Sequence, residues 1–402
     1  MMIFRKTMAS WSVTVALLAM SGSATASGFA LIEQSASGLG NAFAGGAAGA
    51  EDASTVFFNP AGMSRLSGKQ VVFSGHVIKP SVKFSGTGAS GTDMGGDAGS
   101  AAFVPNAYFA MEVRPDLKVG LGVNAPFGLQ TQYDAAWVGR YHAIKSKIET
   151  VNVNPAIAYQ VNDALSIGAG LDYQHISGEL SNYDDVLGTT VVKGTDNAWG
   201  YNLGVLYNFN PNARIGVAYR SAISYTLNGD ITSALPLANT PVSLDLKLPG
   251  MLSVSGFHQL NDQWDFMADV SWTGWSTFKQ IKVVNNSGAV VSSTIENWKD
   301  TVRVSVGATH HYNQQWLSRF GLAYDQSPVP EAYRTARIPD NNRTWLALGG
   351  QYKPSMASAI DFGYAHLFVG DSTVNDANPS PALVGTYKNS VDILSAQYTY
   401  TF

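Results

Sequence analysis

The chain has 402 residues, of which only 13% are charged, whereas charged residues make up about a quarter of an ordinary globular protein. It contains no cysteine, which excludes disulfide frameworks, cysteine-ligated metal sites, iron–sulfur clusters and thiol catalysis. Its net charge of −4 gives no electrostatic basis for binding nucleic acid, so we expect no nucleic-acid partner. The 40 glycines and the aromatic content of 11% indicate a transmembrane β-barrel.

The first 26 residues have the pattern of a secretory signal peptide. Arg5 and Lys6 precede an apolar run over 11–20, and the small residues Ala-Thr-Ala at 24–26 fit a cleavage site. The run of about 10 apolar residues is too short for a transmembrane helix, which needs roughly 20. We therefore predict a signal peptide over residues 1–26 and export of the chain. A short buried helix is the alternative.

Residues 27–68 show no strand-like alternation, and 17 of these 42 positions are Gly or Ala. Asn59 followed by Pro60 predicts the start of a short helix, because Asn caps helix N-termini and Pro is tolerated in the first turn. The segment also contains large apolar side chains such as Phe57 and Phe58, which are unusual in a disordered tail. We predict that it folds as a plug inside a barrel; a disordered periplasmic tail is the alternative.

From residue 69 to the C-terminus the sequence alternates with a period of two, as strands with one apolar face do. At the C-terminus, Leu394 and Tyr398 fall on one face and Ser395 and Gln397 on the other. Counting such runs gives about fourteen candidate strands. They span 69–85, 104–114, 117–130, 143–160, 164–181, 197–209, 212–227, 242–260, 262–280, 298–314, 316–326, 341–353, 356–368 and 386–402.

The connections between these runs alternate between short turns and long loops. Tight turns rich in Asn, Asp and Pro alternate with longer loops near 86–103, 131–142, 182–196, 228–241, 281–297, 327–340 and 369–385. Outer-membrane barrels have an even number of antiparallel strands, short periplasmic turns and long outer loops. A soluble β-sandwich or propeller also alternates, but it does not explain Trp and Tyr on the outer face. We therefore predict an all-β fold, with a transmembrane barrel of about 14 strands over residues 69–402.

Several segments resemble the FadL family of outer-membrane transporters. They are SGFALIEQSASGLGNAFAGGAAGAEDASTVFFNPAGMSRL (27–66), PFGLQTQYDAAWVGRYHAIKS (126–146), NVNPAIAY (152–159), LPGMLSVS (248–255), DVSWTGWSTF (269–278) and DQSPVPEAYRTARIPDNNRTWLALG (325–349). The resemblance covers essentially the whole mature chain, and its motifs occur in the expected order. It implies a fourteen-stranded barrel in the Gram-negative outer membrane, plugged by an N-terminal hatch over residues 27–68.

No catalytic motif is present. The sequence lacks a G-x-S-x-G elbow, a P-loop and an H-E-x-x-H motif. His310 and His311 are neighbours, and neighbours in a strand point to opposite faces, so they do not chelate one metal ion. We therefore expect no catalytic residue, no metal and no cofactor, and the chain is not expected to be an enzyme. A hydrolytic site assembled in space from separate strands stays the alternative.

A plug is useful when the cargo is apolar, because a general porin that filters polar solutes gains nothing from one. An energised siderophore-type receptor uses a far larger plug domain than 42 residues. Apolar molecules gain about 0.8 kcal/mol for each methylene that enters hydrocarbon. The resemblance implies capture of the substrate, transfer to a lumenal pocket and sideways exit through the wall into outer-membrane lipid.

The expected substrate is a hydrophobic small molecule, first of all a long-chain fatty acid, carried passively by a monomer. An aromatic hydrocarbon channel of the same family is one alternative, and a non-specific porin is another. A wall opening needs a strand with locally broken pairing, and Pro and Gly both weaken the ladder. We therefore assign the opening to Asn124, Pro126, Phe127 and Gly128 in the third candidate strand. A strand that simply ends there is the alternative.

The remaining site residues are assigned with the resemblance in view. Asn59, Pro60 and Ala61 match the hatch motif of the family and are expected to shape the hatch against the wall opening. Phe29 and Leu31 are expected to contact the apolar ligand, with packing inside the plug as the alternative. Arg303 or Arg319 is expected to pair with a fatty acid carboxylate, with a structural ion pair as the alternative.

Overall fold

The computed structural model describes residues 28–235 and 240–402. The predicted signal peptide over residues 1–26 lies outside the described residues. In the part of the chain that is described, no helix has both the length and the apolar character needed to cross a membrane.

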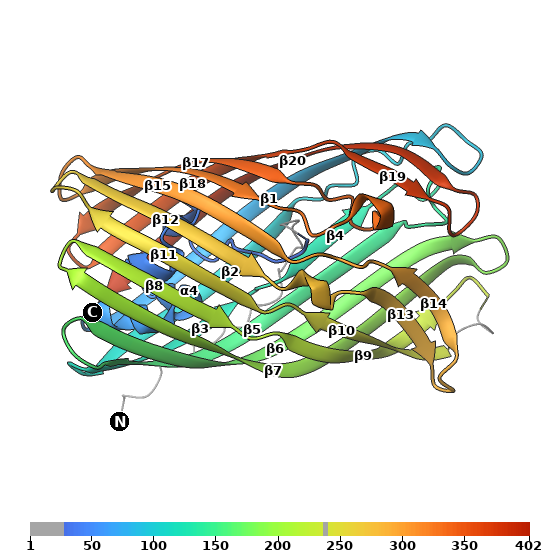
Figure 1. The fold of residues 1–402 in the computed structure, drawn as a ribbon. Helices are drawn as coiled ribbons and strands as arrows, with labels where there is room; N and C mark the ends of the chain where they lie inside the picture. Colours follow the sequence, from blue (N-terminus) through green and yellow to red (C-terminus); the bar gives the residue numbers. More distant parts are fainter. Residues whose placement is uncertain (1–27, 236–239) are drawn as a thin grey trace, which may run out of the picture.

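The described residues form twenty strands in one sheet, and fourteen of them close into an antiparallel barrel. The barrel closes because β1 pairs with β2 on one side and with β20 on the other. Short turns gather at one end and long loops at the other (Figure 1). The wall strands are β1 (Lys69–Thr87), β2 (Ala102–Arg114), β3 (Leu117–Asn124), β5 (Lys145–Gln160), β6 (Leu165–Asp184), β7 (Gly188–Asn210), β8 (Ala213–Arg220), β11 (Met251–Gln259), β12 (Trp264–Thr273), β15 (Thr301–His311), β16 (Trp316–Asp325), β17 (Arg343–Ser355), β18 (Ser358–Val369) and β20 (Leu383–Thr401).

Six further strands extend the wall toward the long-loop end. They are β4 (Gly128–Gln132), β9 (Ile223–Thr232), β10 (Thr240–Leu248), β13 (Gln280–Asn285), β14 (Val290–Ile295) and β19 (Ser372–Asp376). Two short 3-10 turns, η4 (Trp275–Thr277) and η5 (Glu331–Tyr333), lie in the long connections.

Several predicted loops are strand in part. The predicted loop over 281–297 contains the hairpin of β13 and β14, and the one over 369–385 contains β19. The sequence predicted a loop over 182–196, but β7 begins at Gly188 and pairs with β6 up to Gly188 opposite Asp184. Residues 191–195 of β7 also pair with β9, so both edges of this stretch are hydrogen-bonded. The alternation of apolar and polar residues in this stretch is weak, but hydrogen bonding on both edges stabilises it as a strand.

The predicted alternation of the wall is confirmed. Val306 and Leu394 point outward and are 57% and 62% exposed, whereas Arg303 and Gln397 on the opposite face are buried. Every backbone group within a bilayer must be paired internally, and a closed sheet achieves this. The outer face is therefore suited to lipid, and the inner face presents polar groups to whatever fills the lumen.

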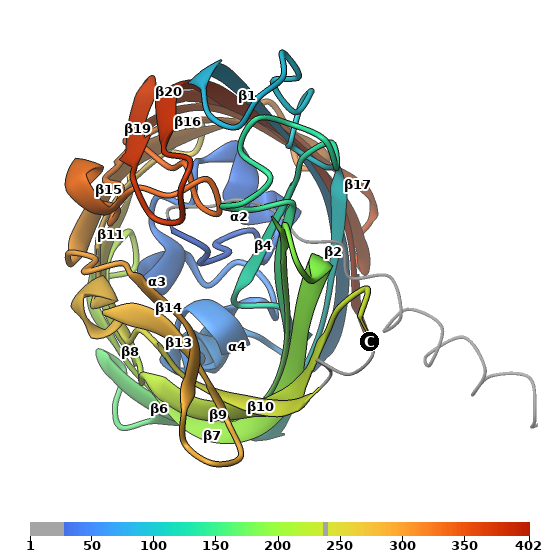
Figure 2. The same ribbon diagram turned by 90° about the vertical axis from the view of Figure 1, so that its right-hand side faces the viewer.

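The N-terminal segment (residues 28–68) lies within the ring of strands (Figure 2). It contains the helices α2 (Ala36–Gly40), α3 (Gly46–Gly49) and α4 (Thr55–Phe58) and the 3-10 helix η2 (Pro60–Arg65). These short helices contact wall strands on several sides: α2 packs on β16 to β18, α3 on β8 and β11, and η2 on β5 to β7. Small side chains let the segment turn repeatedly within this confined space.

Candidate functional site

The wall is broken in its third strand. β3 ends at Asn124 and β4 begins at Gly128, so the strand is interrupted and then resumes. We call residues 125–127 the interruption. The pairing of β2 with β3 stops at Ala107 opposite Val123. β4 forms a ladder with β5, and on its other side an isolated bridge joins Thr131 to Gly99. Residues 102–106 of β2 consequently face the interruption without a ladder, and we call this place the gap.

The first described residues of the N-terminal segment bind the interruption through their backbone. The Leu31 N–H donates to the Pro126 carbonyl at 2.8 Å, and the Gly128 N–H donates to the Phe29 carbonyl at 2.9 Å. Ala30 and Phe127 thus form an antiparallel bridge. The interruption lacks backbone hydrogen-bond partners in the wall. Residues inside the barrel supply these partners instead.

The next residues of the segment bind the other side of the gap. The Asn106 side chain of β2 donates to the Glu33 carbonyl at 3.0 Å, and the Tyr108 hydroxyl donates to the Gln34 side chain at 3.4 Å. The Gln34 amide also donates to the Ala125 carbonyl at 3.0 Å. Residues 29–34, which we call the sealing stretch, thus close the gap from inside by binding both of its edges.

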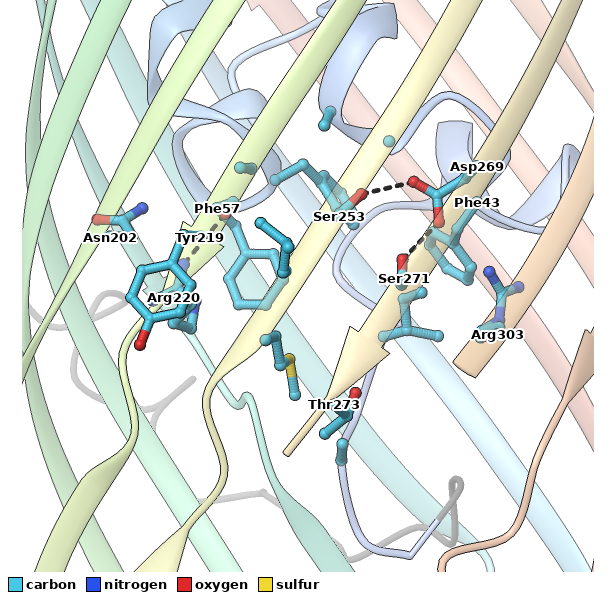
Figure 3. Close-up of a pocket in the computed structure, with 18 of the residues that line it drawn as sticks. Phe43, Phe57, Asn202, Tyr219, Arg220, Ser253, Asp269, Ser271, Thr273 and Arg303 are labelled. Atoms are coloured by element: carbon cyan, nitrogen blue, oxygen red, sulfur yellow. Dashed lines mark hydrogen bonds between the residues drawn. The ribbon is translucent and has the colours of Figure 1, made fainter. Parts of the chain in front are cut away.

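A cavity of about 130 Å3 lies beside the sealing stretch (Figure 3). Apolar side chains of the N-terminal segment line it, and so do Met251, Trp275 and Trp345 of the barrel. The residues contributed by the N-terminal segment include Leu31, Ile32, Phe43, Phe57 and Phe58. Leu31 therefore borders the cavity, a position that is compatible with its predicted contact to an apolar ligand. An apolar cavity of this kind is suited to an apolar ligand.

Polar groups line one side of the cavity. Asp269 accepts hydrogen bonds from Ser253 at 2.5 Å, from Ser255 at 2.6 Å and from Ser271. Arg220 forms an ion pair with Asp172 and donates to the Phe57 carbonyl at 3.1 Å. These charges are compensated, because each has charged or hydrogen-bonding partners within the protein.

Arg303 also lines the cavity, and its hydrogen bonding is incomplete. One of its terminal nitrogens donates to the Ala42 carbonyl at 2.6 Å and the other to the Ser305 hydroxyl at 3.3 Å. Its Nε is buried with no hydrogen-bond partner among the described residues. The guanidinium lies 5.1 Å from the centre of the Trp345 ring. Arg303 therefore has one donor without a partner in the described part of the chain, and that donor is buried in this structure.

Arg319, the other candidate arginine, lies outside the cavity. It donates to Asp361 at 2.6 Å and to Glu51 of the N-terminal segment at 2.8 Å, and it is not among the residues that line the cavity. Arg319 therefore has the contacts of a structural ion pair, the alternative given for it from sequence, and it has no contact with the cavity. Two carboxylates already bind its two terminal nitrogens, and its Nε, although unpartnered among the described residues like that of Arg303, belongs to a side chain that does not line the cavity.

Phe29 packs in an aromatic cluster and is not among the residues that line the cavity, so its contacts are those of the packing alternative. Its ring centre lies 4.7 Å from that of Trp275, and 5.5 Å from those of Phe278 and Trp298. Phe127 of the interruption lies 6.1 Å away on another side. Phe29 therefore connects the interruption to residues of the long loops. Its link to the cavity is Trp275, which contacts both.

The Asn59-Pro60-Ala61 triplet sits against glycines of the wall. The Asn59 side chain caps η2 by accepting from the Ala61 N–H at 3.0 Å, and it donates to the Val205 carbonyl at 3.0 Å. Gly168 of β6 and Gly204 of β7 are directly opposite each other and lie beneath the triplet. A β-carbon on Gly204 would lie 1.9 Å from the Asn59 side-chain oxygen.

This position corrects a prediction from sequence. The triplet was expected to shape the plug against the interruption, but its hydrogen bonds and closest approaches are to β6 and β7. The sealing stretch contacts the interruption instead. The physical reason is the course of the segment, which begins at the gap and then turns repeatedly before it reaches η2.

A buried carboxyl supports the aromatic cluster from the long-loop side. Glu296 is 1% exposed and accepts a hydrogen bond from the Trp298 indole at 3.0 Å, while its second oxygen is unpartnered. Burial raises the pKa of the Glu296 carboxyl to about 8, although the Trp298 hydrogen bond and the charge of Arg337 act in the opposite direction. The folded chain therefore holds this group protonated at neutral pH.

The raised pKa of Glu296 predicts a pH dependence. Since the folded chain binds this proton more tightly than the unfolded chain, stability should fall as the pH rises from about 4.5 to about 8 and then stay level. Glu296→Gln should remove that loss, which is at most about 5 kcal/mol for a pKa raised from 4.5 to about 8. The measurement is the free energy of unfolding in urea across this pH range. An unchanged pH dependence in the Gln variant would contradict the assignment.

The histidines do not assemble a metal site. Among residues 28–235 and 240–402, no group of three or more His, Asp or Glu side chains is placed to hold a metal ion. His311 pairs with Asp265 at 2.7 Å on the lumen side, whereas the ring of His310 lies 4.5 Å from that of Trp264. The two neighbours thus point to opposite faces, as predicted.

Residues 17–402 match the profile of a family described as "Outer membrane protein transport protein (OMPP1/FadL/TodX)". The chain belongs to the FadL family. This confirms the resemblance seen in the sequence and places the chain in the Gram-negative outer membrane. The family consists of outer-membrane transport proteins and not of enzymes.

Relatives and solved structures of the FadL family cover nearly the whole chain. The "Long-chain fatty acid transport protein" of Salmonella typhi is 30% identical over 91% of this chain and 93% of its own. The "Outer membrane protein P1" of Haemophilus influenzae is 31% identical over 88% and 89%. A crystal structure of a Pseudomonas aeruginosa FadL homologue is 25% identical, with a TM-score of 0.87 over 93% of this chain and 99% of that one.

A more distant FadL-family structure shares the fold. The toluene transporter TbuX of Ralstonia pickettii is 21% identical and has a TM-score of 0.65, over 89% of this chain and 95% of that one. At this identity the likeness shows the fold alone.

Sequence reasoning missed two features of the site. The first is the pair Gly168 and Gly204, although glycines in register on adjacent strands are a signal for close approach of another segment. The second is the set of three serines around Asp269. Ser253 and Ser255 lie on β11 and Ser271 on β12, so their shared partner is visible only once the register is known.

Proposed function

We propose that this chain carries apolar molecules across the outer membrane and releases them sideways through the gap in the third strand. In this proposal residues 27–68 act as a hatch, residues 69–402 form the transporting barrel, and the functional unit is a monomer. One observation carries the proposal: the sealing stretch binds both edges of the gap and also borders an apolar cavity. Movement of a single short stretch would then connect the cavity to the lipid.

Long-chain fatty acids are the substrate class that we propose first. Relatives at 30% identity are named long-chain fatty acid transport proteins. The free Nε of Arg303 offers a charge-assisted hydrogen bond to a carboxylate, and the apolar side chains around the cavity suit an acyl chain. A long acyl chain exceeds a volume of about 130 Å3, so its entry requires the side chains of the hatch to shift.

An aromatic hydrocarbon is the second candidate, because the volume of the cavity favours it. An apolar cavity of roughly 150 Å3 can hold one benzene molecule, which is close to the cavity of about 130 Å3 beside the sealing stretch. A non-specific porin is disfavoured, since the N-terminal segment contacts wall strands on several sides of the lumen.

Uptake of oleate and toluene tests the proposal. A strain that lacks the chain should take up oleate faster when the chain is restored. Arg303→Leu should lower oleate uptake by roughly tenfold and leave toluene uptake nearly unchanged, because only the fatty acid has a carboxylate. Arg303→Lys keeps the charge and should retain part of the oleate uptake.

The outcomes separate the candidates. If restoring the chain raises the uptake of neither substrate above that of the deficient strain, the transport proposal is contradicted. A gain of toluene alone supports the aromatic hydrocarbon candidate. If Arg303→Leu lowers the uptake of oleate and of toluene equally, Arg303 has a structural role and does not bind the carboxylate. The shift in gel mobility on heating checks that the barrel of each variant is assembled.

A further inference from the structure

Three lysines gather on the outer face of the barrel where its first and last strands meet. Lys79 and Lys83 lie on β1 and Lys388 on β20, and all three are exposed. In the register of the two strands, Lys83 is directly opposite Lys388, and Lys79 is opposite Asp392. We call Lys79, Lys83 and Lys388 the seam lysines.

The seam lysines lie beyond the apolar band, on the side of the long loops. Val77, which precedes Lys79 on the same face, is 45% exposed, and Leu394 opposite it is 62% exposed. Lys83 and Lys388 lie about 20 Å beyond Val77 and Leu394 along the strands, at about 3.3 Å per residue. Because the long loops of outer-membrane barrels are extracellular, this level corresponds to the headgroups of the outer leaflet.

The seam lysines form no close ion pair within the described residues. None of the three has a carboxylate oxygen within 4.0 Å of its ammonium in the part of the chain that the structure describes. Like charges directly opposite each other on neighbouring strands are destabilising, and Lys83 and Lys388 are such a pair. An external anion between them would remove the repulsion.

The two nearest carboxylates are occupied by other donors. Asp97 accepts from the Ser81 hydroxyl and from the Val82 N–H, both at 2.7 Å. Asp392 accepts from the Tyr364 hydroxyl at 2.7 Å and contacts the His366 ring at 2.8 Å. Lys83 acts electrostatically on Asp97 and Lys79 on Asp392, but neither lysine forms an ion pair within 4.0 Å in the described part of the chain, so the ammonium groups keep donors for an external anion.

On the opposite side of the barrel, near the same long-loop end, three outward-facing lysines are ion-paired. Lys145 and Lys193 lie 3.1 and 3.6 Å from Glu179, and Lys147 lies 2.8 Å from Glu149. These lysines of β5 and β7 point outward near the same end of the barrel, and each has a carboxylate partner. The seam lysines are therefore not a general feature of the rim.

We propose that the seam lysines bind the phosphate groups of a phosphorylated glycolipid in the outer leaflet. An ammonium is a compact cation that binds phosphate as a point charge, and three of them around one strand seam suit a lipid with two phosphates. The adjacent apolar band accommodates the acyl chains of the same molecule. The bound lipid would hold together the seam at which the barrel closes.

Binding of lipid A by the purified full chain in detergent tests this proposal. We expect the wild-type chain to bind bis-phosphorylated lipid A more tightly than the dephosphorylated lipid, with the difference shrinking at high ionic strength. The triple variant Lys79→Gln, Lys83→Gln and Lys388→Gln should raise the Kd for bis-phosphorylated lipid A at least about tenfold. Replacing the same three residues by Arg should preserve the affinity.

A matched triple variant serves as the control. Lys145→Gln, Lys147→Gln and Lys193→Gln removes the same charge from the ion-paired side and should change the Kd by less than about twofold. An equal loss in the control would show a general charge effect and overturn the proposal. Equal wild-type affinity for both lipids would also overturn it. Heat-modified gel mobility verifies that both variants are folded.

Discussion

A disulfide between positions 30 and 127 should abolish uptake of the apolar substrate. Ala30 and Phe127 are bridge partners, and opposed Cα atoms in antiparallel pairs lie about 4.5–5.5 Å apart, within the range of a disulfide. The chain has no cysteine of its own, so Ala30→Cys with Phe127→Cys forms one defined cross-link. If cargo leaves only when the sealing stretch separates from the interruption, the oxidised variant should transport no more than the deficient strain.

Reduction and a second cysteine pair control this experiment. Reduction of the cross-link should restore uptake, measured on the same cells with labelled oleate. Ala268→Cys with Val306→Cys places a disulfide between β12 and β15, which are paired in the wall, and should leave uptake unchanged. Full uptake by the oxidised 30–127 variant would show that the gap need not open.

Replacing Gly204 by valine should release the hatch and make the barrel conduct ions. The β-carbon at position 204 would lie 1.9 Å from the Asn59 side-chain oxygen and 3.0 Å from Pro60. Overpacking of this kind costs about 1–3 kcal/mol, which corresponds to a roughly 5- to 150-fold increase in the population with an unseated hatch. The measurement is single-channel conductance in planar bilayers, where the wild-type chain should be nearly closed.

Gly256 of β11 supplies the control for this substitution. A β-carbon there would meet no atom within 4 Å, so Gly256→Val tests the effect of a new side chain in the wall without a clash at the hatch. We expect its conductance to equal that of the wild type. If Gly204→Val is folded but conducts no more than Gly256→Val, the contact of Asn59 and Pro60 with Gly204 does not hold the hatch in place.

The barrel could be predicted from sequence because its signal is local. A strand in a wall between lipid and lumen alternates with a period of two, and each run, such as Trp264 to Thr273, carries that pattern by itself. The interruption was also visible, since Pro126 and Gly128 weaken a ladder wherever they occur. The predicted loop over 182–196 failed because its strand character comes from pairing on both edges.

The contacts of the hatch could not be predicted in the same way. Asn59 meets Gly204, and Phe29 meets Trp298, across more than a hundred residues of sequence. Such contacts depend on how the segment turns inside the lumen, which no periodicity records. The same limit explains Arg319: its charge was evident, but its two carboxylate partners come from β18 and from the hatch.

The route of the cargo is tested most directly by a fatty acid that carries a photoreactive diazirine on its chain. Cells are illuminated during uptake, and the adducts on the protein are mapped by mass spectrometry. The account predicts adducts at both edges of the gap, on residues 102–106 and 124–128. Adducts at the polar mouth of the short-turn end, around Arg214, Asp265 and His311, with none at the gap would contradict it.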